Sequence, residues 1–336
     1  MVIYIFNFGD YYLDNLILIS GEDNGIRLDR FIRRRIPALK QAQLEKLLRI
    51  GKIRVDTKKV KAGIRLQSGQ EIELKFDLSK YLSEDVSAKI NTSKLIISDA
   101  SKRKAVNILE SWKIEETSEW IAINKPAGIA VQGGSKIKHH LDRLLQEGFG
   151  DSRPRLVHRI DKDTSGVLLL AKTQKSARLL TQYFRDHLIN KTYLAFCIGK
   201  IGQSGKISEP VAKSLKTGIE KMIVDQDLGR TSISLFERIF YNSGISLVCL
   251  RPVTGRTHQL RVHMNFIGVP ILGDGKYNSN KAQPSGNFAK KLHLHSHFMT
   301  LPSGQLITAR VPEHMQLAAS ILGADIPDQN QYFSND

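Results

Sequence analysis

The sequence has few cysteines and no long apolar stretch, and both absences narrow the class of protein. Cys197 and Cys249 are the two cysteines among 336 residues, and their spacing is not that of a zinc site or a redox motif. We therefore expect buried, reduced thiols, as in a cytoplasmic protein. No apolar run reaches the roughly 20 residues that a membrane-spanning helix needs. The apolar residues 1–8 lack the basic segment and cleavage site of a signal peptide.

Acidic residues are also scarce. The chain has 33 Asp and Glu against 50 Lys and Arg, which gives a formal net charge of +17 and a pI near 9.8. This excess favours a polyanionic partner, with nucleic acid as the first candidate and an anionic membrane surface as the second. Glycine-rich nucleotide-binding motifs are missing: Gly133-Gly134-Ser135 is not followed by the Lys-Ser/Thr of a P-loop, and no G-x-G-x-x-G occurs.

The positive charge is concentrated near the N-terminus. Residues 20–75 hold 15 Lys and Arg against 7 Asp and Glu. Two amphipathic helices are predicted there, one from Ile26 that stops before Pro37 and one over residues 43–50, followed by strands at 52–56 and 70–74. A solvated helix face would explain one basic run. Because basic residues recur on both helices and the next strand, we predict a nucleic-acid-binding module with these candidate contacts: Arg27, Arg30, Arg33, Arg34, Lys46, Arg49, Lys52 and Arg54.

The rest of the chain predicts a linker and a larger domain. Residues 78–110 are polar and weakly periodic, as in a linker. From residue 111 to about 325, strands and short helices alternate without the regular βα units of a doubly wound sheet. The predicted class is α+β, with a mixed sheet flanked by helices. Strands are expected at 119–124, 240–250, 259–263 and 291–299, and a helix at 176–188.

The richest segment for chemistry is residues 158–166, His-Arg-Ile-Asp-Lys-Asp-Thr-Ser-Gly, just before the apolar run 167–170. Asp163, Thr164, Ser165 and Gly166 fit a turn that hydrogen-bonds its own backbone. Asp161 has no such local role, so it is the candidate for catalysis. An aspartic-protease interpretation fails, because the D-T-G triplet is interrupted and has no second copy.

A second segment supplies arginines without local partners. No carboxylate lies between Arg251 and His263, so its arginines need a distant carboxylate or a phosphate. We expect Arg256 to pair with Asp161. His293, His295 and His297 would share one strand face, which leaves a metal site open, although packing histidines are commoner. Tyr193 on its own would be read as a core residue.

Five motifs resemble the RluA-type RNA pseudouridine synthases in order and spacing, over about residues 118–312. The segment around Asp161 resembles the signature H-R-L-D-x-D-T-S-G. The four others are Asn124-Lys125-Pro126-Ala127-Gly128, Lys191-Thr192-Tyr193-Leu194-Ala195, residues 255–263 (GRTHQLRVH), and Gly273-Asp274-Gly275-Lys276-Tyr277.

Two further likenesses refine this resemblance. Arg27-Leu28-Asp29 and residues 51–55 (GKIRV) are similar to the small RNA-binding domain typified by ribosomal small-subunit protein four, which would span residues 20–77. The chain departs from that domain at Asp56-Thr57, where Asn-Gly is common. Residues 130–135 and 251–255 are most similar to family members of the C type, which act on large-subunit (23S) ribosomal RNA. The D type is the nearest alternative.

The resemblance implies isomerisation of uridine to pseudouridine without a cofactor or metal. It makes Asp161 the catalytic carboxylate, Arg256 its partner, and Tyr193 the residue that stacks on the flipped base. Arg159 would fill the space that the base leaves. A cytoplasmic monomer that binds ribosomal RNA is expected. Two rival functions stay open, a non-catalytic RNA-binding ribosome-assembly factor and a metal-dependent nuclease that uses Asp161, Asp163 and the 293–297 histidines.

Overall fold

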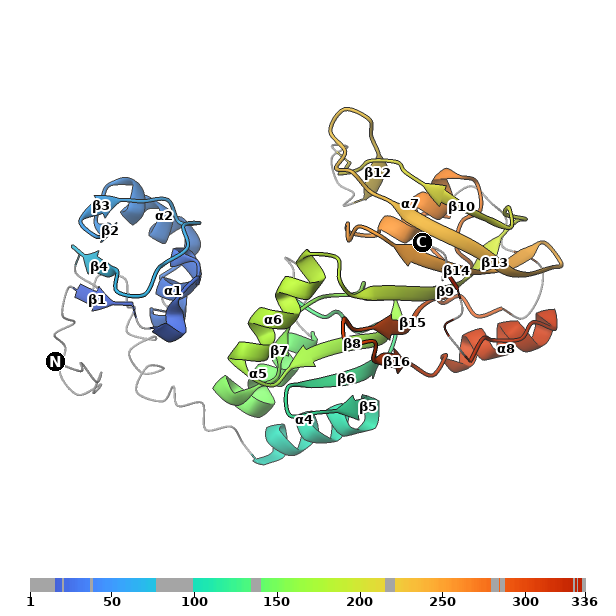
Figure 1. Cartoon of the computed structure of the whole chain (residues 1–336), viewed down its shortest axis with the longest axis horizontal. Coiled ribbons are helices and arrows are strands. Elements are labelled where there is room, and N and C mark those ends of the chain that lie inside the picture. Colours follow the sequence, from blue (N-terminus) through green and yellow to red (C-terminus); the bar gives the residue numbers. More distant parts are fainter. Residues whose placement is uncertain are drawn as a thin grey trace. The chain divides into compact units, whose positions relative to one another are not determined.

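The computed structural model describes residues 16–19, 21–36, 39–76, 99–133, 140–214, 221–278, 284, 288–328, 330 and 332–333. The chain divides into two compact units, residues 1–96 and 97–336 (Figure 1). The predicted helix stop at Pro37 and most of the predicted linker lie outside the described residues.

The first unit is a four-stranded antiparallel sheet with two helices. The strand order is β1-β4-β2-β3. Apolar residues at helical spacing in both helices, among them Phe31, Leu44 and Leu48, pack against Ile53 and Ile72 of the sheet. The predicted helices and strands are confirmed to within two residues. The elements are β1 (Leu16–Leu18), η1 (Gly21–Asp23), α1 (Leu28–Arg35), α2 (Gln41–Arg49), β2 (Ile53–Val55), β3 (Lys58–Lys59) and β4 (Glu71–Leu74).

The hairpin turn between β2 and β3 uses two residues in the left-handed region, Asp56 at φ 48° and Thr57 at φ 65°. Two-residue hairpin turns of this kind usually hold Asn-Gly, because glycine tolerates positive φ. The Asp56 carboxylate accepts hydrogen bonds from the Glu71 backbone N–H at 2.9 Å and from Gln70 Nε2 at 2.8 Å. Asp56 therefore gains partners in this conformation.

The second unit is built on a ten-stranded sheet whose main path runs β10-β13-β14-β9-β15-β8-β6-β5. β8 and β15 are parallel, whereas the other pairs along this path are antiparallel. The mixed, mostly antiparallel sheet confirms the α+β prediction. Its strands are β5 (Lys113–Glu116), β6 (Trp120–Lys125), β7 (Arg155–Leu156), β8 (Ser165–Ala171), β9 (Asn190–Ile198), β10 (Ser204–Ile207), β13 (Ser234–Asn242), β14 (Ile245–Pro252), β15 (Leu294–Thr300) and β16 (Leu306–Thr308), with β11 (Val211–Lys213) and β12 (Met222–Val224) as a separate pair.

Helices cover both faces of this sheet (Figure 1). α4 (Asp99–Trp112) and α5 (Leu141–Phe149) pack on one face of β6 and β8, and α6 (Gln174–Arg185) packs on the other. α7 (Gln259–Phe266) and α8 (Glu313–Leu322) pack on opposite faces of β9 and β14. A short 3-10 turn, η3 (Gly150–Ser152), follows α5. Cys197 and Cys249 are buried free thiols in this core, as expected.

Three sequence predictions are wrong in this unit. Residues 240–250, predicted as one strand, contain the end of β13, a turn and the start of β14, because Ser243 and Gly244 adopt positive φ and the chain reverses there. Asp99–Trp112 forms helix α4, so the predicted linker does not extend over those residues, and Leu109 packs in the core. Residues 259–263, predicted as a strand, begin helix α7. Within the described ranges, no helix is both long and apolar enough to cross a bilayer.

Candidate active site

The candidate catalytic residues line one cavity of about 380 Å³. Its walls come from the turn at residues 157–164, from Lys191 and Tyr193 of β9, and from the segment 252–261 that ends in α7. Asp161, Arg159, Tyr193 and Arg256 all line it. The fold therefore brings together residues that lie almost a hundred positions apart in the chain.

Close packing of β8 on β15 positions the turn that carries Asp161. Gly166 has φ 112°, and a Cβ there would approach the Ser296 carbonyl oxygen to 2.2 Å. The strands approach this closely only because residue 166 is glycine. The Ser165 hydroxyl shares a 2.9 Å hydrogen bond with His295 Nδ1, and the Thr164 N–H donates to the Asp161 carbonyl at 3.2 Å. Residues 164–166 thus serve as a scaffold.

His158 also has a structural role in this turn. Its Nε2 accepts a hydrogen bond from the Leu169 N–H at 2.8 Å, and its ring stacks on Phe184 at 4.1 Å. Burial, with a smaller effect from Lys191, lowers the pKa of His158 to about 3. A neutral imidazole with one nitrogen bound to the backbone supports the turn and does not exchange protons near neutral pH.

Lys125 joins the 126–129 loop to the catalytic turn, a role that the sequence did not reveal. Its side chain is fully buried, and Nζ donates to the carbonyls of Pro126 at 2.8 Å, Ile129 at 2.9 Å and Lys162 at 3.1 Å. All three ammonium hydrogens therefore have acceptors. Burial lowers the pKa of Lys125 to about 8, although Asp163 and Asp161 oppose the shift.

Two cationic or protonatable groups approach the Asp161 carboxylate, whose side chain is 18% exposed. Arg261 Nη1 lies 3.8 Å from Oδ2, and His258 Nε2 lies 3.9 Å from the same oxygen. The predicted pairing with Arg256 is not observed. Arg256 lines the cavity, but its Nε donates to the Thr231 carbonyl at 3.2 Å. The guanidinium beside Asp161 thus comes from Arg261.

Arg261 is held by a second carboxylate. Its Nε and Nη2 donate to Asp274 at 2.8 and 2.7 Å, and both side chains are almost fully buried. Its guanidinium carbon also lies 5.1 Å from the centre of the Tyr277 ring. Because Asp274 fixes the Nε and Nη2 edge of the planar guanidinium, the remaining nitrogen, Nη1, points in a defined direction. Asp274 thereby orients the group that faces Asp161.

His258 is held in a left-handed conformation, with φ 55°, where α7 begins. Its Nδ1 lies 2.7 Å from the Tyr277 hydroxyl, which accepts from the Met222 N–H at 3.1 Å. The hydroxyl proton is then available to Nδ1, which leaves a proton on Nε2 beside Asp161. Burial lowers the pKa of His258, while Asp161 opposes the shift.

Tyr193 is 9% exposed and lines the cavity with Asp161. Burial raises the pKa of its phenol to about 12, and the Asp161 charge adds to the shift. The phenol is therefore neutral at physiological pH, which disfavours action as a base. The ring remains available for stacking.

The three histidines at 293, 295 and 297, of which the last two lie on β15, contact backbone carbonyls of the protein. His295 Nε2 lies 3.1 Å from the Ala309 carbonyl, and His297 Nδ1 lies 2.8 Å from the same oxygen. His293 Nδ1 lies 2.8 Å from the Lys291 carbonyl. Among the described residues, no group of three His, Cys, Asp or Glu side chains is placed to hold a metal ion.

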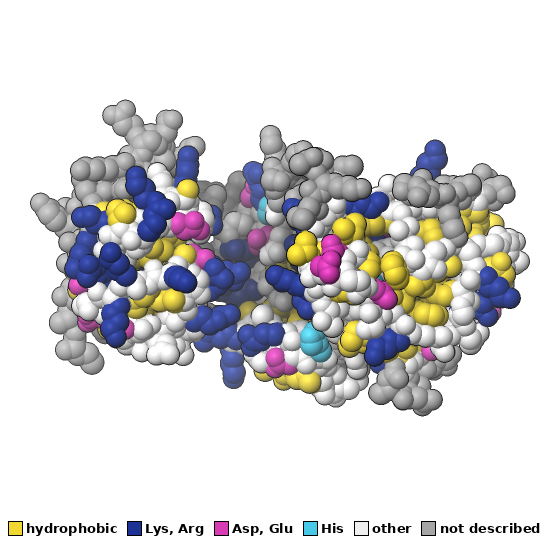
Figure 2. All heavy atoms as spheres, turned by 90° about the horizontal axis from the view of Figure 1, so that it is seen from above, with side chains coloured by type: hydrophobic (Ala, Val, Ile, Leu, Met, Phe, Trp, Pro, Cys, Tyr) yellow, Lys and Arg dark blue, Asp and Glu magenta, His cyan; other side chains and the backbone are white. Residues whose placement is uncertain are grey.

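Lys and Arg side chains are exposed on the first unit (Figure 2). Those predicted to contact RNA fall into two groups, according to whether they have a partner within the protein. Arg27 pairs with Asp29 at 2.7 Å, Arg34 lies 3.9 Å from Asp23, and Arg54 donates to the carbonyls of Gly51 and Thr57. The other residues predicted to contact RNA have exposed side chains without an ion pair among the described residues: Arg30, Arg33, Lys46, Arg49 and Lys52.

Comparison with known proteins shows the family. Residues 119–266 match the RNA pseudouridylate synthase family. The ribosomal large subunit pseudouridine synthase C of Rickettsia bellii is 37% identical over 85% of this chain and 93% of its own length. The synthase C of Salmonella typhi is 29% identical over 90% and 94%. The chain belongs to the RNA pseudouridylate synthase family and is an RNA-modifying isomerase.

The fold agrees with this assignment. The structure of human RNA pseudouridylate synthase domain containing 4 superposes with a TM-score of 0.57 and 23% identity. The superposition covers 68% of this chain and 99% of that one.

Proposed function

We propose that this enzyme converts specific uridines of large-subunit (23S) ribosomal RNA into pseudouridine, with Asp161 as its catalytic carboxylate. The observation that carries the proposal is the Asp161 carboxylate in a cavity with Arg261 and His258 within 4 Å and Tyr193 on the wall. The substrate class is the one for which the relatives are named, and the chain matches those relatives over most of their length.

The reaction rearranges one nucleotide and transfers nothing away. The N-glycosidic bond between uracil N1 and ribose C1′ breaks, the base turns within the cavity, and a bond forms between C5 and C1′. The proton on C5 leaves and N1 gains one. Asp161 begins the sequence in one of two ways, by attack on C1′ or by removal of the C2′ proton. Both require the ionised carboxylate, which the Arg261 guanidinium favours.

The other lining residues hold the nucleotide. A uridine within a stack cannot reach Asp161, so it must be flipped out. Tyr193 stacks on the flipped base, and exposed Arg159 fills the space that the base leaves. Arg256, exposed at the rim, contacts the RNA backbone. In this assignment Arg261 takes the role that the sequence suggested for Arg256.

The first unit adds RNA affinity. Its exposed Arg30, Arg33, Lys46, Arg49 and Lys52 contact phosphates without reading sequence. The unit then acts as an RNA-binding domain of the kind typified by ribosomal small-subunit protein four. We further propose that the enzyme works as a monomer in the cytoplasm.

The test is Asp161→Asn, with Asp163→Asn as the matched control. Asp163 is exposed in the same turn, so its substitution removes an equal charge nearby. Pseudouridine formed in large-subunit rRNA fragments is measured for each variant. Asp161→Asn should lower kcat more than 1000-fold with RNA affinity within about threefold of wild type, whereas Asp163→Asn should stay within about tenfold in kcat.

Residual turnover of Asp161→Asn within tenfold of wild type would contradict the assignment of Asp161 as the catalytic carboxylate. A wild-type chain that binds rRNA fragments but forms no pseudouridine in any of them would favour the non-catalytic RNA-binding factor instead.

A further inference from the structure

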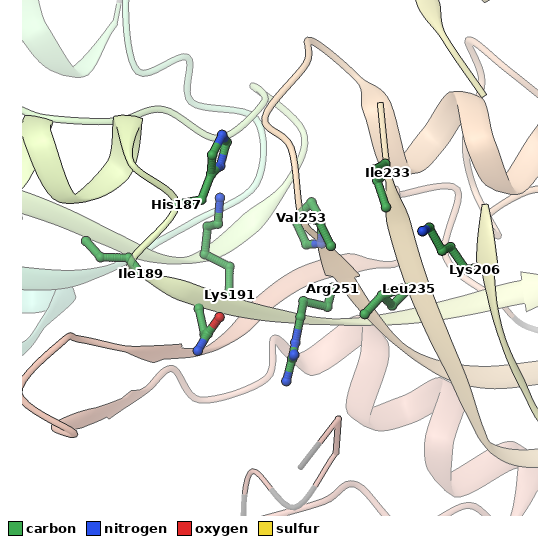
Figure 3. Close-up of a pocket in the computed structure, with 10 residues that line it drawn as sticks. His187, Ile189, Lys191, Lys206, Ile233, Leu235, Arg251 and Val253 are labelled. Carbon is green, nitrogen blue, oxygen red and sulfur yellow. The ribbon is translucent and has the colours of Figure 1, made fainter. Parts of the chain in front are cut away.

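A second cavity, of about 400 Å³, is drawn in Figure 3. It adjoins the cavity that holds Asp161. Lys191 and Pro252 line both cavities. Lys191 lies on β9 two residues before Tyr193, and side chains at that spacing point to the same side of a strand. The two cavities are therefore neighbours along the side of β9 on which Tyr193 stacks on the base in our proposal.

The second cavity is positively charged. The ammonium groups of Lys191 and Lys206 line it, His187 lies beside them, and none of its described lining residues is acidic. Among the described residues, neither Lys191 nor Lys206 takes part in an ion pair or a side-chain hydrogen bond. In Figure 3, Lys191 extends from β9 toward His187. Lys206 enters from β10.

Arg251 does not belong to this charged set. Its Nη2 donates to the Phe333 carbonyl at 2.9 Å, and its guanidinium carbon lies 4.6 Å from the centre of the Phe333 ring. In Figure 3 its guanidinium points away from Lys191 and His187. The aliphatic part of the Arg251 side chain forms part of the cavity wall, whereas Lys191 and Lys206 supply the positive charge.

Lys191 is only partly exposed, and burial lowers its pKa. A half-buried ammonium without a counter-charge is unfavourable, and an anion that enters the cavity would relieve this cost. The remaining wall is apolar, from Ile189, Ile233, Leu235 and Val253, of which Val253 is 38% exposed. The cavity thus has a lysine on each of two sides, Lys191 from β9 and Lys206 from β10, with apolar side chains between them (Figure 3).

We propose that this second cavity binds the nucleotide next to the target uridine in the RNA strand. Its base lies on the apolar wall, and its phosphate lies between Lys191 and Lys206. A free inorganic anion would leave the apolar wall uncovered. The inference rests on the proposed function, since it places the neighbour of a uridine held by Tyr193. It makes this cavity a subsite for single-stranded RNA beside the target uridine.

The test combines a protein variant that lacks one lysine charge with RNA in which one phosphate is replaced by a neutral link. Lys206→Gln removes a charge that lines the second cavity and not the first. The control, Lys200→Gln, removes an exposed lysine beyond the other end of β9 that lines neither cavity. Each full-length variant is assayed on a modified rRNA fragment in which single phosphates near the target uridine are replaced by neutral methylphosphonates.

In the wild type, one flanking methylphosphonate should raise KM about tenfold, the scale of one charge-assisted contact, and leave kcat within twofold. In Lys206→Gln the same replacement should change KM less than twofold, because the phosphate has already lost its partner. Lys200→Gln should respond like the wild type. An abasic nucleotide at that position should raise KM further in the wild type and in Lys206→Gln alike.

The subsite is overturned if Lys206→Gln stays as sensitive as the wild type to every methylphosphonate, or if Lys200→Gln loses sensitivity equally. Both outcomes are read from pseudouridine formed by active enzyme. A failure of the proposed function would instead appear as no pseudouridine in the wild type.

Discussion

At the scale of single residues, the site depends on charges held in fixed directions. Asp274 is 1% exposed and binds two nitrogens of Arg261, so the third nitrogen has one direction left, toward Asp161. His258 is fixed in the same way through Tyr277. A carboxylate in such surroundings keeps its position when a nucleotide enters, because its neighbours do not need to rearrange.

The contributions of the aromatic ring and of the hydroxyl of Tyr193 can be measured separately. Because burial raises its pKa to about 12, we expect the ring to matter more than the hydroxyl. Tyr193→Phe should keep kcat within about tenfold of wild type, whereas Tyr193→Ala should lose about 100-fold, on the scale of one stacked base. Single-turnover pseudouridine formation measures both variants.

Fluorescence of the two tryptophans, Trp112 and Trp120, serves as the folding control for these variants, since both lie in the second unit. A loss beyond 1000-fold in a folded Tyr193→Phe protein would instead mean that the hydroxyl takes part in proton transfer.

At the scale of elements, helix α7 shows why sequence reasoning reached only part of the site. Leu260, Val262 and Met264 alternate with Arg261 and His263, and alternation predicts a strand. In the structure Arg261 and His263 are also buried, because Asp274, Ser234 and the Glu209 carbonyl supply partners. A helix buried on several sides has no polar face to reveal its period.

The motifs around Asp161 and Tyr193 were predicted from sequence because they lie in short contiguous segments. The pairing of Arg261 with Asp274 could not be predicted in this way, since only the fold brings these two residues together. Lys125 was missed for the same reason. Its three acceptors are backbone carbonyls, which any sequence supplies.

The β2–β3 turn offers a stability test at this scale. Thr57 at φ 65° is β-branched and strained, so Thr57→Gly should stabilise the first unit by about 0.5–1 kcal/mol. Hydrogen exchange of the α1 and α2 backbone amides should then slow by about two- to fivefold. Asp56→Gly is the contrast, because it relieves a similar strain but removes the carboxylate that binds the Glu71 N–H. Equal slowing in both variants would contradict this account of the turn.

At the scale of the whole molecule, the net charge of +17 does not say where RNA binds. Two explanations differ in their consequences. Either affinity follows total charge, or it follows the exposed cations of α2 and the residues just after it. The first unit permits a comparison at constant charge, because it carries two sets of three exposed cations: Lys46, Arg49 and Lys52, and Lys58, Lys59 and Lys61.

We expect glutamine at positions 46, 49 and 52 to weaken binding of rRNA fragments and to reduce the slope of log Kd against log salt by about two. Glutamine at 58, 59 and 61 should change the slope by less than half as much. Fluorescence anisotropy over a range of salt concentrations measures both triple variants. Equal changes would mean that this unit attracts RNA by net charge alone. A larger effect at 46, 49 and 52 would place phosphates on the α2 side of the unit.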